Sequence, residues 1–332
     1  MAYRIIIATL FLSLGLTQNL FPELGGQRVG TSIFTFLKIG VSARASGMSD
    51  AVVSLDQDAG SVYYNPGTIA QFNSTEFSAS SIRWPADIRY DFCSISSSIS
   101  GRHYLGLNAG ILHMKPMPET TEYLPDGTGN YFVYQDHFIG LTYAARMTDR
   151  FSFGVTAKRV EENLAGNKMS TVLLDMGTFY WTGFHTLKFS AALSNFGSQT
   201  KPNGTFAKRY LDRSTGEETV NESAEFTEFS PPTVFRVGSS IDLLHDDLQV
   251  LTVALQLNHP VDNSESVVIG TEYTILKMLS FRAGYRFNRA EDLSMGFGLY
   301  LPIDTMTLRA DYSYSNFNYL SDPTRFSIGL SF

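Results

Sequence analysis

The chain has 332 residues, of which 17% are charged and 13% aromatic, and its formal net charge is −7. Soluble globular domains usually carry about 25% charged residues, and an acidic balance gives no indication of a nucleic-acid partner. The single cysteine, Cys93, excludes an internal disulfide framework and a cysteine-rich metal site. The aromatic content and the 27 glycines favour many short strands over helices.

The N-terminus has the pattern of an export signal. Arg4 provides a basic start, and a mostly apolar run follows from Ile5 to Leu16. This run is too short for a membrane-spanning helix, which needs about 20 apolar residues. We therefore expect a signal peptide over residues 1–25, cleaved between Leu16 and Gly26; the alternative is a buried N-terminal helix. Beyond residue 20 there is no run of about 18 apolar residues, so the chain can reach a membrane only through strands.

From Ser74 onward the dominant hydrophobic period is two. In the last strand, for example, Phe326 and Ile328 share one face, and Arg325 and Ser327 share the other. A soluble β-sandwich also alternates in this way. Segments of about ten residues that alternate apolar with small or polar side chains are typical of the lipid-facing and lumen-facing positions of a transmembrane barrel.

About 14 such segments can be distinguished between residues 74 and 332. They are 74–83, 89–98, 102–114, 134–147, 150–161, 170–182, 185–195, 233–243, 248–259, 264–275, 277–287, 292–301, 304–314 and 324–332.

The connections between these segments alternate in length. The short ones are Ile99 to Gly101, Thr148-Asp149, Gly183-Phe184, Leu244 to Asp247, Leu276 and Pro302-Ile303. The longer ones are Trp84 to Ile88, Lys115 to Val133, Glu162 to Met169, Phe196 to Pro232, Pro260 to Asn263, Asn288 to Glu291 and Ser315 to Pro323. Short turns at one rim and longer loops at the other are typical of bacterial outer-membrane barrels. The predicted fold class is therefore all-β: an antiparallel transmembrane barrel of about 14 strands in the outer membrane.

The final strand ends on Phe332, which we interpret as the assembly signal of such barrels. We expect residues 324–332 to close the barrel by pairing with the segment near Ser74 to Arg83, with Leu330 facing outer-membrane lipid. Aromatic residues near segment ends are candidates for the interfacial girdles. These are Trp84, Tyr90, Phe92, Tyr134, Phe138, Tyr180, Trp181, Phe287, Tyr300, Tyr312 and Tyr314.

Residues 26–73 break the period-two pattern and are rich in small residues. A barrel of about 14 strands has a lumen wider than its own wall side chains can fill. We therefore predict that residues 26–73 form an N-terminal hatch, or plug, inside the barrel.

Short motifs within this segment resemble the hatch of the FadL-like outer-membrane proteins, most closely the PorV/PorQ branch. The matching residues are Ser42, Arg44, Gly47, Met48, Asp50, Asp58, Tyr64, Asn65 and Pro66. The family continues from this Asn-Pro with Ala-Gly-Leu-Ala, whereas this chain has Gly67-Thr68-Ile69-Ala70. The resemblance implies a 14-stranded barrel with a hatch. It also implies one of two roles: FadL passes long-chain hydrophobic molecules, and PorV relatives serve type IX protein secretion.

Several charged residues occupy positions that the alternation assigns to the lumen. They are Lys158, Arg236, Arg282, Arg286, Arg309, Asp311 and Arg325. An unpaired charge against a packed plug would be costly, so we expect ion pairs within the wall and with hatch acids such as Asp50, Asp56 and Asp58. The alternative is that the basic set recognises a carboxylate or another anion inside the barrel.

Residues 115–133 and 196–232 form the two longest connections, and loops of such length are often functional. They are candidate contact sites for secreted cargo or secretion components; the alternative for the longer one is a flexible cover. The six histidines show no metal-ligand spacing, and no nucleophile or nucleotide-binding motif is present. We therefore expect no catalytic residue, metal or cofactor.

Two functions remain open from the sequence. The first is a PorV/PorQ-like barrel that handles exported protein in type IX secretion. The second is a FadL-like channel for hydrophobic small molecules such as long-chain fatty acids, which predicts a bound amphiphile, an apolar pocket behind the hatch and a lateral opening in the wall.

Overall fold

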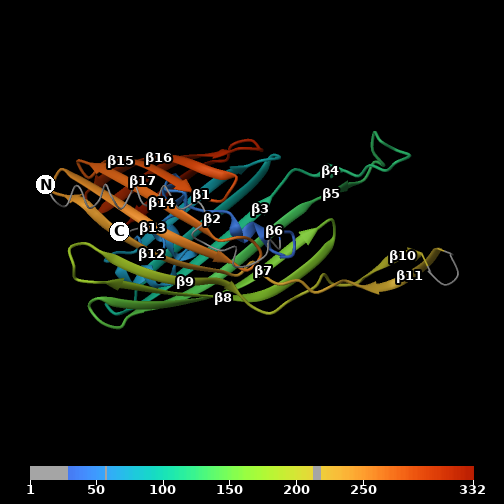
Figure 1. Ribbon diagram of the computed structural model, residues 1–332, viewed down its shortest axis with the longest axis horizontal. Coiled ribbons are helices and arrows are strands. Elements are labelled where there is room, and N and C mark those ends of the chain that lie inside the picture. The colour runs from blue at the N-terminus through green and yellow to red at the C-terminus, as the bar shows by residue number, and fades with distance from the viewer. Residues whose placement is uncertain (1–28, 57, 212–217) are drawn as a thin grey trace.

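The computed structural model describes residues 29–332 except residue 57 and residues 212–217, so the predicted signal peptide lies outside the described residues. Within this part of the chain, fourteen antiparallel strands close into one barrel (Figure 1), which confirms the predicted fold class. The wall strands are β1 (Glu76–Trp84), β2 (Ile88–Ser98), β3 (His103–His113), β6 (Tyr134–Arg146), β7 (Phe151–Leu164), β8 (Asn167–Trp181), β9 (Lys188–Phe196), β12 (Val234–His245), β13 (Gln249–Pro260), β14 (Ser266–Ile275), β15 (Leu279–Arg286), β16 (Glu291–Ile303), β17 (Met306–Phe317) and β18 (Thr324–Ser331).

Strand β18 closes the barrel against β1, as expected. The pairing runs from Glu76 opposite Ser331 to Arg83 opposite Thr324. Reciprocal hydrogen bonds continue the ladder to the chain end: the Phe332 amide donates to the Thr75 carbonyl at 3.0 Å, and the Thr75 amide donates to Phe332 at 2.9 Å. Closure gives each wall strand two hydrogen-bonded neighbours and so removes exposed sheet edges.

Several predicted connections are wrong. The two-residue turn expected at Gly183-Phe184 is longer, because β8 ends at Trp181 and β9 begins only at Lys188. Strand β7 runs to Leu164 and β8 begins at Asn167, so the loop expected from Glu162 to Met169 is a two-residue turn. Ala165 and Gly166 both have positive φ, 50° and 90°, as a tight hairpin turn that matches the strand twist requires. The turn expected at Pro302-Ile303 lies one pair later, because β16 continues through Ile303.

The two longest connections carry hairpins of their own. Strands β4 (Met117–Pro118) and β5 (Tyr131–Phe132) pair in one, and β10 (Thr205–Leu211) and β11 (Glu218–Glu225) pair in the other. Figure 1 shows both hairpins projecting beyond the same end of the barrel. The longer-loop rim is therefore dominated by these two extensions.

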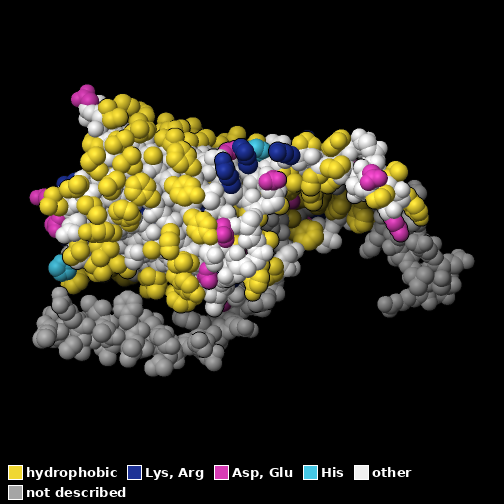
Figure 2. Space-filling view, turned by 90° about the horizontal axis from the view of Figure 1, so that it is seen from above, with side chains coloured by type: hydrophobic (Ala, Val, Ile, Leu, Met, Phe, Trp, Pro, Cys, Tyr) yellow, Lys and Arg dark blue, Asp and Glu magenta, His cyan; other side chains and the backbone are white. Residues whose placement is uncertain are grey.

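The outer face of the wall is apolar over a broad belt (Figure 2). On β18, Phe326 is 48% and Ile328 is 41% exposed, while the preceding residue of the same strand, Arg325, faces inward and is 1% exposed. An outward apolar belt with an inward polar face is the arrangement that a bilayer selects, so the chain is a bacterial outer-membrane β-barrel. None of the helices in the described residues is long and apolar enough to cross a bilayer.

Only some of the residues predicted for the aromatic girdle lie on the outer face of the barrel. Tyr180, Trp181, Phe287, Tyr312 and Tyr314 are exposed on the outer face or at its rims. The others point into the barrel, because the strand alternation places them on the lumenal face, where they pack or form hydrogen bonds. These inward residues are Trp84, Tyr90, Phe92, Tyr134, Phe138 and Tyr300.

The described residues of the range 29–73 are here called the lumenal segment, and from Ile33 to Phe72 they are mostly buried inside the barrel. It contains η1 (Thr35–Lys38), α2 (Ala43–Gly47), η2 (Ala59–Tyr63) and η3 (Pro66–Gln71). Side chains cap three of these short helices: Ser42 accepts from the Ala45 amide, Asp58 from Gly60 and Asn65 from Gly67. Helix α2 packs against β15 to β18, η2 against β1 to β3, and η3 mainly against β6 to β8. The buried core of the molecule therefore lies between the lumenal segment and the wall.

Candidate functional site

The residues of the hatch-like motif fix the lumenal segment to itself and to the wall. Ser42 Oγ donates to Asp58 Oδ2 at 2.9 Å. Asn65 Nδ2 donates to the carbonyls of Val53 at 2.8 Å and Thr178 at 2.9 Å. One buried amide thus joins two parts of the segment to strand β8. Because a buried polar group costs free energy when it is unpaired, these hydrogen bonds specify one position for the segment.

Glycines in the wall allow the segment to approach closely. A Cβ at Gly284 would overlap the Met48 backbone, and a Cβ at Gly154 would lie 2.5 Å from the Pro66 carbonyl carbon. A Cβ placed on Gly47, in the segment, would likewise lie 3.0 Å from the Cα of Gly296 in the wall. The motif residues Gly47, Met48 and Pro66 therefore occupy places where side chains on the facing strand are excluded.

Arg44 joins the segment to a chain of alternating charges in the wall. Its Nε and Nη2 donate to the two oxygens of Glu272 at 2.9 and 2.7 Å. Arg282 donates to Glu272 at 2.5 Å and to Asp311 at 2.7 Å. Bidentate arginine–carboxylate pairs are among the stronger polar contacts in proteins, so this network is well suited to hold α2 against β14 and β15.

Asp50 forms a second anchor. Arg286 Nη2 donates to Asp50 Oδ2 at 2.5 Å, and the Tyr64 hydroxyl donates to Oδ1 at 3.0 Å. Burial by itself raises the pKa of the Asp50 carboxyl, but attraction to Arg286 and Arg325 and the hydrogen bonds from Arg286 and Tyr64 outweigh it. The pKa of Asp50 therefore lies below its ordinary value, and the carboxylate is charged at neutral pH.

The seven predicted lumenal charges all face inward, and most are in ion pairs. Lys158 pairs with Asp175 at 2.8 Å. Further pairs join Arg309 to Glu76 and, at 3.5 Å, Arg325 to Glu291. Arg236 differs: it donates to Ser194 Oγ at 2.8 Å, and no carboxylate among the described residues lies within ion-pair distance of it.

A cavity of about 140 Å³ separates the lumenal segment from β12 to β15 near the longer-loop rim. Four basic residues line it: Lys38, Arg236, Arg286 and Arg289. Two acids, Asp50 and Asp262, also line it and pair with Arg286 and Lys38. Arg289 donates to Asn263 and Ser264 rather than to a carboxylate. The cavity thus has an excess of positive charge and is chemically suited to a carboxylate or phosphate.

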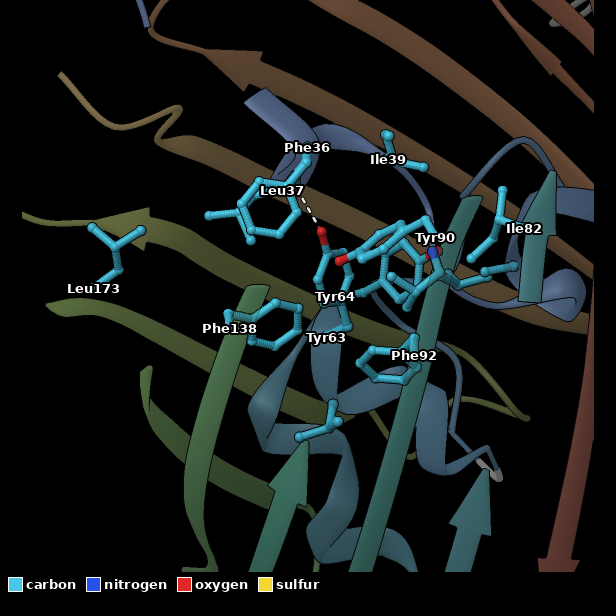
Figure 3. Close-up of a cluster of buried hydrophobic side chains, with 14 of the residues drawn as sticks. Phe36, Leu37, Ile39, Tyr63, Tyr64, Ile82, Tyr90, Phe92, Phe138 and Leu173 are labelled. Carbon is cyan, nitrogen blue, oxygen red and sulfur yellow. Dashed lines mark hydrogen bonds between the residues drawn. The ribbon is translucent and has the colours of Figure 1, made fainter. Parts of the chain in front are cut away.

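The same cavity has an apolar side formed by Leu37, Tyr63 and Tyr64, which are shown in Figure 3. The Tyr63 ring packs against Phe92 and Phe138, with ring centroids 5.8 and 6.0 Å apart. Its hydroxyl donates to the Leu37 carbonyl at 2.7 Å. Tyr63 therefore contacts the cavity on one side and wall aromatics on the other. We call Tyr63, Phe92 and Phe138 the aromatic partition.

On the outward side of the wall, a groove of about 430 Å³ lies over β2, β3 and β6. Its apolar lining includes Cys93, Ala109, Ile111 and Ile139. Residues of the aromatic partition, Phe92 and Phe138, also line this groove. The groove therefore lies across the wall from Tyr63, and Tyr63 stands between these wall aromatics and the lumenal cavity.

A glycine makes the wall thin at this point. Gly110 is opposite both Phe92 on β2 and Phe138 on β6 in the strand register. A Cβ at Gly110 would lie 2.5 Å from Cε1 of Phe138 and 3.0 Å from the Tyr90 ring. The rings occupy the space where a side chain of β3 would otherwise stand, so only the paired backbone of β2, β3 and β6 separates these rings from the groove.

The sequence reasoning missed the aromatic partition and the acidic partners of the lumenal charges. Glu272 and Asp175 share inward parity with neighbouring small residues, and this parity is a usable signal. Glu291 has the parity of the outward Leu293, and it reaches Arg325 only because the strand register shifts between Glu291 and Ser294. The inward parity of Phe92 and Phe138 was likewise available. Among the described residues, no group of three or more histidine, cysteine, aspartate or glutamate side chains could hold a metal ion.

The closed wall, the apolar outer belt and the occupied lumen define an outer-membrane β-barrel with part of its own chain inside. Solved channels share this fold. The monoaromatic hydrocarbon channel CymD aligns over 88% of this chain and 97% of its own, with a TM-score of 0.57 and 13% identity. The Pseudomonas putida toluene transporter TodX gives a TM-score of 0.56 at 11% identity, over 88% of this chain and 97% of its own.

A FadL homologue from Pseudomonas aeruginosa is similar to the same extent, with a TM-score of 0.53, 10% identity, and coverage of 88% of this chain and 98% of its own. No family model matches the sequence, and no curated protein sequence matches it. At these identities the likeness establishes a FadL-like fold. The three named neighbours are described as channels, transporters or their homologues.

Proposed function

We propose that the protein is a channel for hydrophobic small molecules with an acidic head, such as long-chain fatty acids, and that the lumenal segment is its hatch. The observation that carries this proposal is the aromatic partition, which borders both the basic cavity and the outer groove. The printed descriptions of the structural neighbours, hydrocarbon and toluene channels, are in keeping with such a role.

The chemistry of the cavity suits an amphiphile better than a plain hydrocarbon. Arg236 and Arg289 have no carboxylate partner among the described residues, so an acidic head would supply one. The tail would lie on Leu37 and Tyr63. For the tail to pass into the groove, and so sideways into the membrane, the partition rings would rotate and the ladder of β2, β3 and β6 would open locally beside Gly110.

Lipid extraction from the purified protein tests this proposal. We expect an amphiphilic acid to co-purify with the wild-type barrel. Arg236→Gln should retain about tenfold less of it, because a charge-assisted hydrogen bond contributes roughly 1.5–3 kcal/mol. Arg102→Gln, an exposed arginine at the short-turn rim, is the matched control. Equal retention by wild type and Arg236→Gln, or no bound amphiphile at all, would contradict the proposal.

The projecting hairpins favour a second candidate function, the handling of exported protein by a PorV/PorQ-like barrel in type IX secretion. Both hairpins extend past the wall, and β10–β11 pairs independently of the barrel sheet. An isolated two-stranded hairpin is marginally stable in water, so a partner surface would stabilise it.

A pull-down distinguishes this second function. The tagged barrel is compared with a variant in which residues 201–228 are replaced by a short glycine-serine turn. Secretion components or secreted cargo should be recovered with the full chain and lost with the variant. Recovery of neither, from cells that possess the secretion system, would exclude the second candidate.

A further inference from the structure

The outer face of the wall carries an unusual basic pair. Arg83 on β1 and Arg89 on β2 stand directly opposite each other in the strand register, and both are exposed. Within the described part of the chain, neither guanidinium has a hydrogen-bond or ion-pair partner. Like charges directly opposite on neighbouring strands destabilise a sheet, so the pair gains stability from any bound anion.

The pair lies at the edge of the apolar belt. Across the neighbouring strands, the outward residues level with Arg89 are His113 on β3 and Gln135 on β6, which form one row. The next outward row toward the middle of the wall contains Asp91, Ile111 and His137. Figure 2 shows basic side chains with acidic and histidine neighbours where the apolar surface ends. His113 Nε2 and Asp91 Oδ2 are 3.2 Å apart, so the Asp91 carboxylate is directed toward His113, and the two arginines outnumber the one carboxylate of these rows.

The outer groove begins directly below these residues. Its lining includes Asp91, Ile111 and His137 from the second row, and Cys93, Ala109 and Ile139 from the third. A single wall surface therefore presents two arginines above and an apolar groove of about 430 Å³ below. This order of charge and apolar surface matches a lipid headgroup above an acyl chain.

We propose that Arg83 and Arg89 bind the phosphate of an outer-membrane lipid whose acyl chain lies in the groove. Arginine is well suited to phosphate because its planar fork donates two parallel hydrogen bonds. Its aliphatic stem can lie on apolar surface while the charge remains at the headgroup level. A free phosphate would use the arginines but not the groove, so the combination specifies a lipid. This site does not depend on the proposed channel function.

Native mass spectrometry of the detergent-solubilised full chain with added phosphatidic acid tests the site. We expect the wild type to retain phosphatidic acid, and Arg83→Gln/Arg89→Gln to bind it about 30-fold more weakly, since two arginines at roughly 1 kcal/mol each contribute about 2 kcal/mol at an anionic lipid surface. Ala109→Phe should also weaken binding, because the new ring fills the groove. Arg102→Gln should bind as the wild type does.

A difference in gel mobility between heated and unheated samples establishes that each variant is a folded barrel before binding is compared. Two results would overturn the proposal. One is equal binding by the wild type and the double-arginine variant. The other is complete displacement of the lipid by millimolar inorganic phosphate together with wild-type binding by Ala109→Phe, which would mean a simple anion site.

Discussion

Single residues decide where this wall is thick and where it is thin. Gly110 is the clearest case, because a Cβ there would meet the rings of Phe138 and Tyr90. Gly110→Ala should therefore lower the free energy of unfolding by about 1–3 kcal/mol, the usual cost of overpacking. Urea unfolding in lipid vesicles measures this. Gly329→Ala is the control, since its nearest neighbour is the flexible Arg309 side chain at 3.3 Å; equal costs at the two glycines would contradict the assignment.

Outward residues report their depth in the membrane. Ile328 faces outward in the interior of β18, whereas Leu330 is near the chain end. Ile328→Arg should lower the free energy of unfolding by about 2–4 kcal/mol, and Leu330→Arg by less, because the cost of a lipid-facing charge falls toward the interface. The same unfolding experiment checks this order. A larger loss of stability for Leu330→Arg than for Ile328→Arg would contradict this position of the apolar belt.

At the scale of elements, the lumenal segment is held by contacts that depend on charge. The pKa of Asp50 lies below 3.8 because Arg286, Arg325 and Tyr64 outweigh the effect of burial. Its contribution to stability is therefore complete above about pH 4 and is lost as the pH falls through the lowered pKa. We expect amide exchange in residues 40–51, corrected for its intrinsic pH dependence, to keep its protection from pH 7 to about pH 4 and to lose it as the pH falls further.

Asp50→Asn is the matched variant for this pH dependence. It keeps the size of the side chain but removes the charge that Arg286 pairs with at 2.5 Å. Protection of residues 40–51 should therefore be lower than in the wild type at pH 7 and should change less toward pH 3. Wild-type protection in Asp50→Asn at neutral pH would show that this ion pair does not hold the segment.

The strands were predictable because alternation is a local property. Residues 324–332 carry both the outward apolar set and the inward Arg325, and the structure pairs them with β1 as expected. Turn geometry was less predictable from the sequence. Residues Glu162 to Met169 have the composition of a loop, but the positive φ values of Ala165 and Gly166 allow a two-residue turn between β7 and β8.

Long-range partners could not be read from one sequence. The pairing of Arg44 with Glu272 joins residues 228 positions apart, and no periodicity specifies it. The inward aromatics were misassigned for a different reason. Tyr90, Phe92 and Phe138 have the residue type of a membrane girdle, but their parity along the strands is inward, and their contacts with Phe36 and Tyr63 show that they line the lumen.

At the scale of the whole molecule, the barrel places a basic cavity, an aromatic partition and an outer groove in series. The proposed route enters from the longer-loop rim and leaves sideways through the wall at β2, β3 and β6. Each part comes from a different region of the chain, and the closed barrel brings the three together. The exit is the part of the proposed route that a change on the outer surface can block without altering the cavity.

The most direct measurement is uptake of a radiolabelled long-chain fatty acid by cells that lack their own channel, normalised to the amount of folded barrel. Ala109 lines the groove, and Ala79 occupies the same outward row on β1 outside the groove lining. Uptake should fall to background in Ala109→Phe and remain at the wild-type level in Ala79→Phe. Wild-type uptake by Ala109→Phe would contradict a lateral exit through this groove.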